Sequence, residues 1–119
     1  MKKYLVFIFA VLVVGLAEAQ QPEAIKASPV KWMTFEEAVE KSKTEKRKIL
    51  IDVYTDWCGW CKVMDKNTFT DPQIAKLLNE KYYPVKFDAE QTADVVFRGT
   101  TFKFVPFGNK GAHQLAMAL

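Results

Sequence analysis

The chain has 119 residues, of which 17 are Lys or Arg and 14 are Asp or Glu, so its formal net charge at pH 7 is +3. Half of the residues are apolar, which suits a single globular domain and excludes a largely disordered chain. The near-balanced charge, with basic residues spread along the sequence, argues against nucleic acid as a partner. Two cysteines are too few for a small domain that disulfides hold together.

The N-terminal segment has the three parts of a secretory signal peptide. Met1-Lys2-Lys3 is basic, residues 4–16 form an apolar run of 13 residues, and Ala17-Glu18-Ala19 supplies small residues before a cut at Gln20. We therefore expect a signal peptide over residues 1–19 and a mature domain over residues 20–119. The protein is then exported, to the periplasm if the source is a Gram-negative bacterium. Otherwise it is secreted, or anchored to the membrane by an uncleaved signal.

The next part of the chain alternates between strand and helix patterns. Thr34 and Glu37 form a capping box at the start of the first helix, and Asp71-Pro72 is typical of another helix start. The predicted elements are, in chain order, a short strand at 30–33, a helix to about 46, an apolar strand at 49–54, a helix from 61 to about 67, a helix from 71 and a strand at 82–88. This order predicts an α/β layered sheet.

The two cysteines lie in Cys58-Gly59-Trp60-Cys61, where the apolar strand gives way to a helix. The free N–H groups and the dipole of a helix N-terminus stabilise a thiolate over a thiol. Cys58 is therefore the candidate nucleophile, because the thiolate is the attacking species. Cys61 follows one helical turn later, and a disulfide between the two requires Cys58 to occupy the non-helical cap position.

Residues 52–62, together with Thr68-Phe69, Asp71-Pro72 and residues 85–88, resemble the thioredoxin superfamily, in particular its small exported bacterial members. The resemblance implies a thioredoxin-like α/β/α layered sheet. It also implies a thiol–disulfide oxidoreductase that acts in cell redox homeostasis through a reversible Cys58–Cys61 disulfide. A bare Cys-X-X-Cys is a weak signal, but a preceding Trp, a strand ahead and a helix behind make it specific.

Asp52 is the one ionisable residue in the strand at 49–54, six positions before Cys58. Related thioredoxins resemble this chain in carrying a buried acid here, which implies a base that takes the proton of Cys61 during exchange. The alternative is a solvated carboxylate at the rim of a strand. A buried carboxyl marks a functional site only in a statistical sense.

Three neighbours of the cysteines are candidate substrate contacts. Trp57 and Trp60 offer flat apolar surfaces beside the pair, and Gly59 serves the turn between them. The alternative is that both indole rings belong to the packing. His113, the single histidine, is distant from the motif in sequence and is expected on the surface of a helix.

Beyond Glu90 the sequence departs from the simplest thioredoxin pattern. Residues 95–98 and 101–105 predict a β-hairpin around Gly99, and residues 112–119 predict a helix. A thioredoxin fold has a cis-proline loop, two antiparallel strands and a closing helix after this point. Pro106 is not followed by a predicted strand and is not expected to be that cis-proline. We therefore expect a thioredoxin-like domain that lacks its C-terminal strands and helix.

Three functional hypotheses remain open from the sequence. The first is the oxidoreductase, with protein or small-molecule disulfides as substrates and a membrane-embedded electron donor as a candidate partner. The second is a module that binds or delivers a soft metal such as copper through two thiolates. The third is an inactive, truncated remnant. No cofactor and no zinc site are expected, because two sulfurs and a distant histidine do not make a four-ligand site. The sequence leaves the direction of electron flow open.

Overall fold

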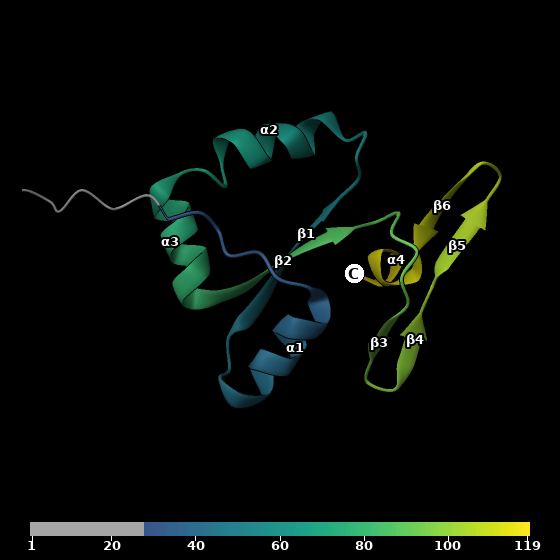
Figure 1. The fold of residues 1–119 in the computed structure, drawn as a ribbon, viewed down its shortest axis with the longest axis horizontal. Helices are drawn as coiled ribbons and strands as arrows, with labels where there is room; N and C mark the ends of the chain where they lie inside the picture. The colour runs from purple at the N-terminus through teal and green to yellow at the C-terminus, as the bar shows by residue number, and fades with distance from the viewer. Residues whose placement is uncertain (1–27) are drawn as a thin grey trace, which may run out of the picture.

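The computed structural model describes residues 28–119, and the expected signal peptide at residues 1–19 lies outside this range. Ten elements follow in the order α1 (Phe35–Thr44), β1 (Lys48–Tyr54), α2 (Gly59–Asn67), α3 (Pro72–Lys81), β2 (Tyr82–Asp88), β3 (Val95–Phe97), β4 (Thr100–Phe102), β5 (Phe104–Phe107), β6 (Lys110–His113) and α4 (Gln114–Ala118). Figure 1 shows the helices α1, α2 and α3 around the β1–β2 pair, with the later strands to one side.

Strands β1 and β2 are parallel and in direct register, with Ile51 opposite Val85. On its other edge, Val85 forms a single bridge with Met33, which is what remains of the strand predicted at residues 30–33. The connection between the two parallel strands runs through α2 and α3. This arrangement is the α/β architecture that the sequence predicts.

The two faces of the sheet are covered by different helices. On one face, Phe35 and Ala38 of α1 pack with Val85 and Phe87 of β2, and Leu115 of α4 joins the same cluster. On the other face, Ala75 and Leu78 of α3 pack with partly buried residues of β1 and of the adjoining loops. Helices therefore lie on both sides of the sheet, and the fold is a thioredoxin-like α/β/α layered sheet.

The predicted helix starts are confirmed at atomic level. Thr34 Oγ1 accepts a hydrogen bond from the Glu37 backbone N–H at 3.1 Å, and the Glu37 carboxylate accepts one from the Thr34 N–H at 2.8 Å. At α3, Asp71 Oδ1 accepts from the N–H groups of Gln73 and Ile74, at 2.8 and 3.1 Å. Both caps satisfy backbone donors that the first turn of a helix leaves free.

After Asp88 the structure differs from the prediction. The first hairpin is present as β3–β4, which turns at Arg98 and Gly99 with positive φ angles of 50° and 78°. A second hairpin, β5–β6, occupies the segment before the short helix α4, which begins at Gln114 and not at Ala112. Gly108-Asn109 is a two-residue hairpin turn, and Gly108 has a φ of 63° that favours glycine.

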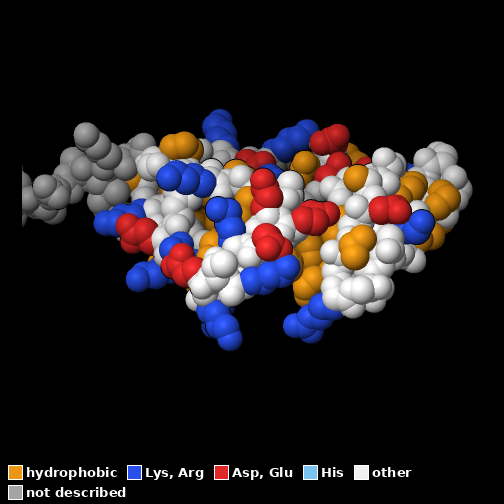
Figure 2. Space-filling model, turned by 60° about the horizontal axis from the view of Figure 1, so that its bottom comes forward, with side chains coloured by type: hydrophobic (Ala, Val, Ile, Leu, Met, Phe, Trp, Pro, Cys, Tyr) orange, Lys and Arg blue, Asp and Glu red, His pale blue; other side chains and the backbone are white. Residues whose placement is uncertain are grey.

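The two hairpins form sheets of their own, so that within residues 28–119 the layered sheet consists of β1, β2 and the Met33 bridge. No peptide bond in this range is cis, so Pro106 is not a cis-proline, as expected. Acidic and basic side chains are interspersed over the face that Figure 2 shows. This mixed surface agrees with the near-balanced composition of the chain.

His113 is completely buried, which corrects the expectation of a histidine on a helix surface. Its Nδ1 accepts a hydrogen bond from the Leu115 N–H at 3.2 Å, and its Nε2 lies 2.9 Å from the Ala93 carbonyl oxygen. The ring also packs edge-on against Phe87. His113 thus caps α4 from inside the core, because β6 extends up to this residue.

Candidate thiol–disulfide site

Cys58 and Cys61 are joined by a disulfide, and Cys58 is the N-cap of α2. Its backbone is extended (φ −73°, ψ 100°), while Cys61 lies within the first turn, 5.3 Å away between Cα atoms. Cys58 Sγ accepts a hydrogen bond from the Cys61 N–H at 3.2 Å. The expected cap position is therefore confirmed, and a helix N–H points at the sulfur on which a negative charge would develop.

The motif follows the carboxyl end of β1, and its neighbours face solvent. Trp57 is 71% exposed and Trp60 is 81% exposed, so neither indole ring is part of the core. A Cβ atom at Gly59 would have open space around it. All three residues flank the disulfide with surface that an incoming molecule can reach.

Asp52 lies in the interior of the sheet and is paired. Its side chain is 12% exposed, and its Oδ2 is 2.5 Å from Lys86 Nζ. The same ammonium group also pairs with Asp65 of α2. Sequence reasoning expected a buried acid at Asp52 but missed its cationic partner. No local signal identifies this partner, because the pairing depends on the register in which Asp52 and Lys86 are direct partners of the β1–β2 ladder.

Three aromatic rings surround the Lys86 ammonium group. Its Nζ lies 5.0 Å from the ring centroid of Trp32, 5.1 Å from that of Tyr54 and 5.5 Å from that of Phe69. Burial acts to lower the pKa of Lys86, but the hydrogen bonds to Asp52 and Asp65 outweigh it, so that the net pKa is raised. Lys86 is therefore a permanent cation between the sheet and α2 at neutral pH.

Two neighbouring groups at the end of β1 complete the electrostatic environment. Burial, followed by the charges of Asp88 and Asp56, raises the pKa of Tyr54. Thr55, three residues before Cys58, has a buried hydroxyl group without a hydrogen-bond partner among residues 28–119. Such a group is costly, because the folded state does not replace the water that it loses.

A groove adjoins the motif between Trp57 and the β5–β6 hairpin. It has a volume of about 530 Å³. Trp57 Nε1 donates a hydrogen bond to Glu90 Oε1 at 3.1 Å, and Lys110 Nζ lies 6.0 Å from the Trp57 ring centroid. Sequence reasoning missed both partners. Glu90 is 33 residues from Trp57 in the chain, and the Lys110 contact depends on a hairpin that was not predicted.

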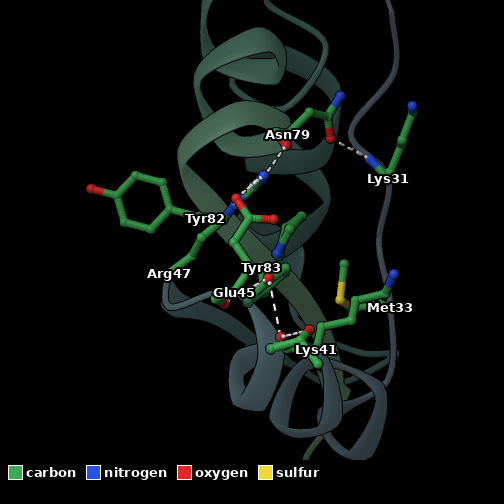
Figure 3. Close-up of a pocket in the computed structure, with 10 residues that line it drawn as sticks. Lys31, Met33, Lys41, Glu45, Arg47, Asn79, Tyr82 and Tyr83 are labelled. Carbon is green, nitrogen blue, oxygen red and sulfur yellow. Dashed lines mark hydrogen bonds and ion pairs between the residues drawn. The ribbon is translucent and has the colours of Figure 1, made fainter.

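A second crevice lies near the opposite end of the sheet, where β2 begins (Figure 3). Its polar side chains are engaged in structural contacts. Arg47 donates to the Asn79 carbonyl oxygen at 3.2 Å and to Glu45 at 2.8 Å, and the Tyr83 hydroxyl donates to the Glu45 carbonyl oxygen at 2.9 Å. These bonds join α1, α3 and β2, so we interpret the crevice as part of the scaffold.

Residues 28–119 contain no group of three His, Cys, Asp or Glu side chains placed to hold a metal ion. Within the same range, no helix combines the length and the apolar character that crossing a bilayer requires.

Comparison with known proteins gives one matching family and several relatives. The model of the family described as Thioredox_DsbH, a protein of unknown function (DUF255), matches residues 17–108. Spermatogenesis-associated protein 20 of Mus musculus is 36% identical over 69 residues, which are 57% of this chain and 9% of the relative. No solved structure matches the chain.

Two bacterial relatives carry the name thiol:disulfide interchange protein DsbD. That of Colwellia psychrerythraea is 31% identical over 66 residues, and that of Vibrio vulnificus is 34% identical over 65 residues. Each match covers 52% of this chain and 11% of the relative. The chain thus spans about a tenth of the length of the curated relatives that it matches.

Proposed function

This chain belongs to the Thioredox_DsbH (DUF255) family within the thioredoxin superfamily, and from that premise we propose that it is an extracytoplasmic thiol–disulfide oxidoreductase. The observation that carries the proposal is the Cys58–Cys61 disulfide with Cys58 at the N-cap of α2. A structural disulfide gains nothing from this position, whereas a nucleophilic thiolate is stabilised by it.

The exchange proceeds in two steps, each of which replaces one S–S bond by another. In the reduced protein, the Cys58 thiolate attacks one sulfur of a substrate disulfide and the other sulfur leaves as a thiolate. Cys61 then loses its proton and attacks Cys58 Sγ, which releases the second substrate thiol. The protein ends with the Cys58–Cys61 disulfide, and the substrate has gained two electrons from the protein, the proton lost by Cys61 and one proton from solvent. The reverse sequence oxidises a dithiol, so the potential of the partner sets the direction.

Asp52 acts in the second step as the base for the Cys61 proton. Its side chain is sheltered and held by Lys86, so its position does not depend on a flexible rotamer. Trp57, Gly59 and Trp60 contact the substrate. The support for this role is that the three residues are exposed and lie next to the cysteines in the chain.

The cellular setting follows from the sequence of residues 1–19, which has the pattern of an export signal. Outside the cytoplasm a reductant needs a supply of electrons, and a membrane-embedded thiol protein is a suitable donor. Protein or small-molecule disulfides are the substrates on the other side of the exchange. Two relatives are named as thiol:disulfide interchange proteins, which supports this class of partner.

The test compares Cys58→Ser with Cys61→Ser in a disulfide-reduction assay that is followed by mass spectrometry. Cys61→Ser is expected to accumulate the mixed disulfide on Cys58, because attack still occurs and resolution does not. Cys58→Ser is expected to form no adduct. Equal adduct formation on either cysteine contradicts the assignment of roles. Metal analysis of the reduced wild type tests the copper alternative, which requires a stoichiometric bound metal.

A further inference from the structure

Strand β1 has an open edge. It pairs with β2 on one side, and no strand among residues 28–119 pairs with it on the other. Its residues 49–53 nevertheless read Ile-Leu-Ile-Asp-Val, with apolar side chains on both faces, which is typical of a strand in the interior of a sheet. The sequence of β1 is therefore that of a central strand, while its position is that of an edge strand.

Burial differs between the two paired strands in the same sense. Val85 and Phe87 of β2 are 0% and 2% exposed. In β1, by contrast, residues 49–51 are only partly buried and Val53 is 37% exposed. One more strand at the open edge would cover apolar area that β1 leaves accessible, and burial of apolar area is favourable.

The hydrogen bonds of β2 define which backbone groups of β1 reach the open edge. The Met33 N–H donates to the Pro84 carbonyl oxygen at 3.0 Å, and the Lys86 N–H donates to the Met33 carbonyl oxygen at 3.3 Å. These two β2 groups thus point away from β1. Because the direction alternates along each strand, the β1 groups that face β2 are those of residues 50, 52 and 54. The N–H and C=O groups that point to the open edge belong to Ile49, Ile51 and Val53.

Within residues 48–54 the open edge lacks the features that keep strands of different molecules apart. β1 has seven residues without a proline, and its direct register with β2 is unbroken by a bulge. Asp52, the charge in its interior, is already matched by Lys86. A long and regular edge of this kind is a template for another strand.

A second copy of this chain fits the open edge through β1 itself. Two copies of one strand that are related by a two-fold axis run antiparallel, so the contact closes with two molecules. With the axis at Leu50, Lys48 of each copy lies opposite Asp52 of the other, and Ile49 lies opposite Ile51 with their outward backbone groups paired. With the axis at Ile51, Asp52 lies opposite Leu50 instead. The first register is favoured, because opposite charges meet in it twice.

We propose that the chain forms a symmetric dimer through antiparallel pairing of β1 with β1 of a second copy. The two molecules then share one continuous sheet with the strand order β2–β1–β1–β2. Each Cys58–Cys61 motif follows the carboxyl end of its own β1, so the two motifs lie toward opposite ends of the central pair and neither lies at the two-fold axis. This assembly does not require the thiol–disulfide activity.

The first test measures association and locates the contact. Sedimentation velocity of the full chain, from micromolar to millimolar concentration, is expected to show a monomer–dimer equilibrium. Amide hydrogen exchange of Ile49 and Ile51 is expected to slow as the dimer forms, whereas the amides of Leu50 and Asp52, which face β2, are protected in both states. A chain that stays monomeric over this range, or a dimer that leaves Ile49 and Ile51 unprotected, overturns the proposal.

A charge reversal tests the register. Lys48→Glu places a carboxylate opposite Asp52 at both ends of the symmetric contact, and it is expected to raise the Kd of the dimer about tenfold or more. Lys76→Glu is the matched control, because it makes the same change of charge at an exposed position of α3. It is expected to keep the wild-type Kd.

A second variant keeps the test informative if Lys48→Glu folds poorly. Val53→Lys adds a charge at an exposed position of the open edge, a feature by which natural edge strands avoid pairing, and it is also expected to weaken the dimer. Val96→Lys, at an exposed position of β3, is its control. A dimer that keeps the wild-type Kd in both edge variants, such as one formed through the apolar run at residues 4–16, contradicts pairing through β1.

Discussion

Lys86 Nζ lies 2.5 Å from Asp52 Oδ2, and the two residues face each other as direct partners of the parallel β1–β2 ladder. Each is the one charged residue in the interior of its strand. The register of the ladder thus brings the two charges together, and the pair holds the carboxylate in place. Asp65 adds a link from the same ammonium group to α2.

Loss of the Lys86 ammonium group is expected to destabilise the fold. Lys86→Met leaves Asp52 sheltered and without a counter-charge, at a cost of about 1–3 kcal/mol in the free energy of unfolding. Lys103→Met is the matched control, because the Lys103–Asp94 pair spans 3.3 Å with side chains 63% and 50% exposed. That surface pair contributes about 0–1 kcal/mol. Urea denaturation of both variants measures the two free energies of unfolding. Equal losses of stability in Lys86→Met and Lys103→Met contradict the prediction.

Removal of the Asp52 carboxylate is expected to slow the resolving step of exchange. Asp52→Asn keeps the shape of the side chain but abolishes the base, so the mixed disulfide on Cys58 persists about a hundredfold longer near neutral pH. Asp94→Asn is the control for loss of one negative charge, since Asp94 is exposed and lies outside the site. Quenched-flow trapping of the mixed disulfide provides the rates. The same lifetime in wild type and Asp52→Asn shows that another group takes the proton.

Stability is expected to fall in strongly alkaline solution. The pKa of Lys86 is raised from 10.5, since its hydrogen bonds to Asp52 and Asp65 exceed the opposing effect of burial. The pKa of Tyr54 is raised from 10.0, first by burial and then by Asp88 and Asp56. Both groups bind their proton more tightly in the folded state. Their stabilisation is therefore complete below those ordinary values and is lost as pH rises through the folded-state values.

The prediction is checked by measuring the free energy of unfolding against alkaline pH for the wild type, Tyr54→Phe and Lys86→Met. The wild type is expected to lose stability as pH rises through 10.0, the ordinary pKa of tyrosine. Around this pH Tyr54 loses its proton in the unfolded state but keeps it in the folded state. Tyr54→Phe and Lys86→Met are each expected to show a smaller alkaline loss than the wild type. A wild-type stability that stays constant or rises through the range contradicts the raised values.

Replacement of the Thr55 hydroxyl group by a methyl group is expected to stabilise the oxidised protein. Thr55 Oγ1 is buried and lacks a partner among residues 28–119, so Thr55→Val removes an unpaired polar group at nearly constant volume. The expected gain in the free energy of unfolding is about 1 kcal/mol. Thr100→Val, at an exposed position of β4, is the control. A loss of stability in Thr55→Val alone means that the hydroxyl is paired in solution.

The sequence alone predicts the elements whose signals are local. Thr34 with Glu37, Asp71 with Pro72, and the cysteine motif after an apolar strand each define a helix start within a few residues, and all three starts are present. The strand at residues 82–88 is confirmed with the same bounds. Caps and short periodic patterns depend on neighbours in the chain, so no knowledge of the tertiary structure is needed to read them.

The parts that sequence reasoning missed depend on contacts between distant segments. Lys86 pairs with Asp52 only because β1 and β2 align in a particular register, which no local pattern specifies. His113 is buried because β6 carries it onto Phe87. The β5–β6 hairpin is an exception, since Gly108-Asn109 is a local turn signal. This signal is ambiguous, because residues 112–119 also have the pattern of a helix.

Helix α2 has no buried residue, and it is only nine residues long. Isolated helices of this length are marginal in water, and its inward side presents little more than Cys61 and Asp65 to the sheet. The ion pair between Asp65 and Lys86 therefore carries much of its attachment to the sheet, while the disulfide closes its first turn. Amide hydrogen exchange in α2 should be faster than in β2, and faster again once the disulfide is reduced. Electron transfer and local opening of the chain are in this way coupled within one helix.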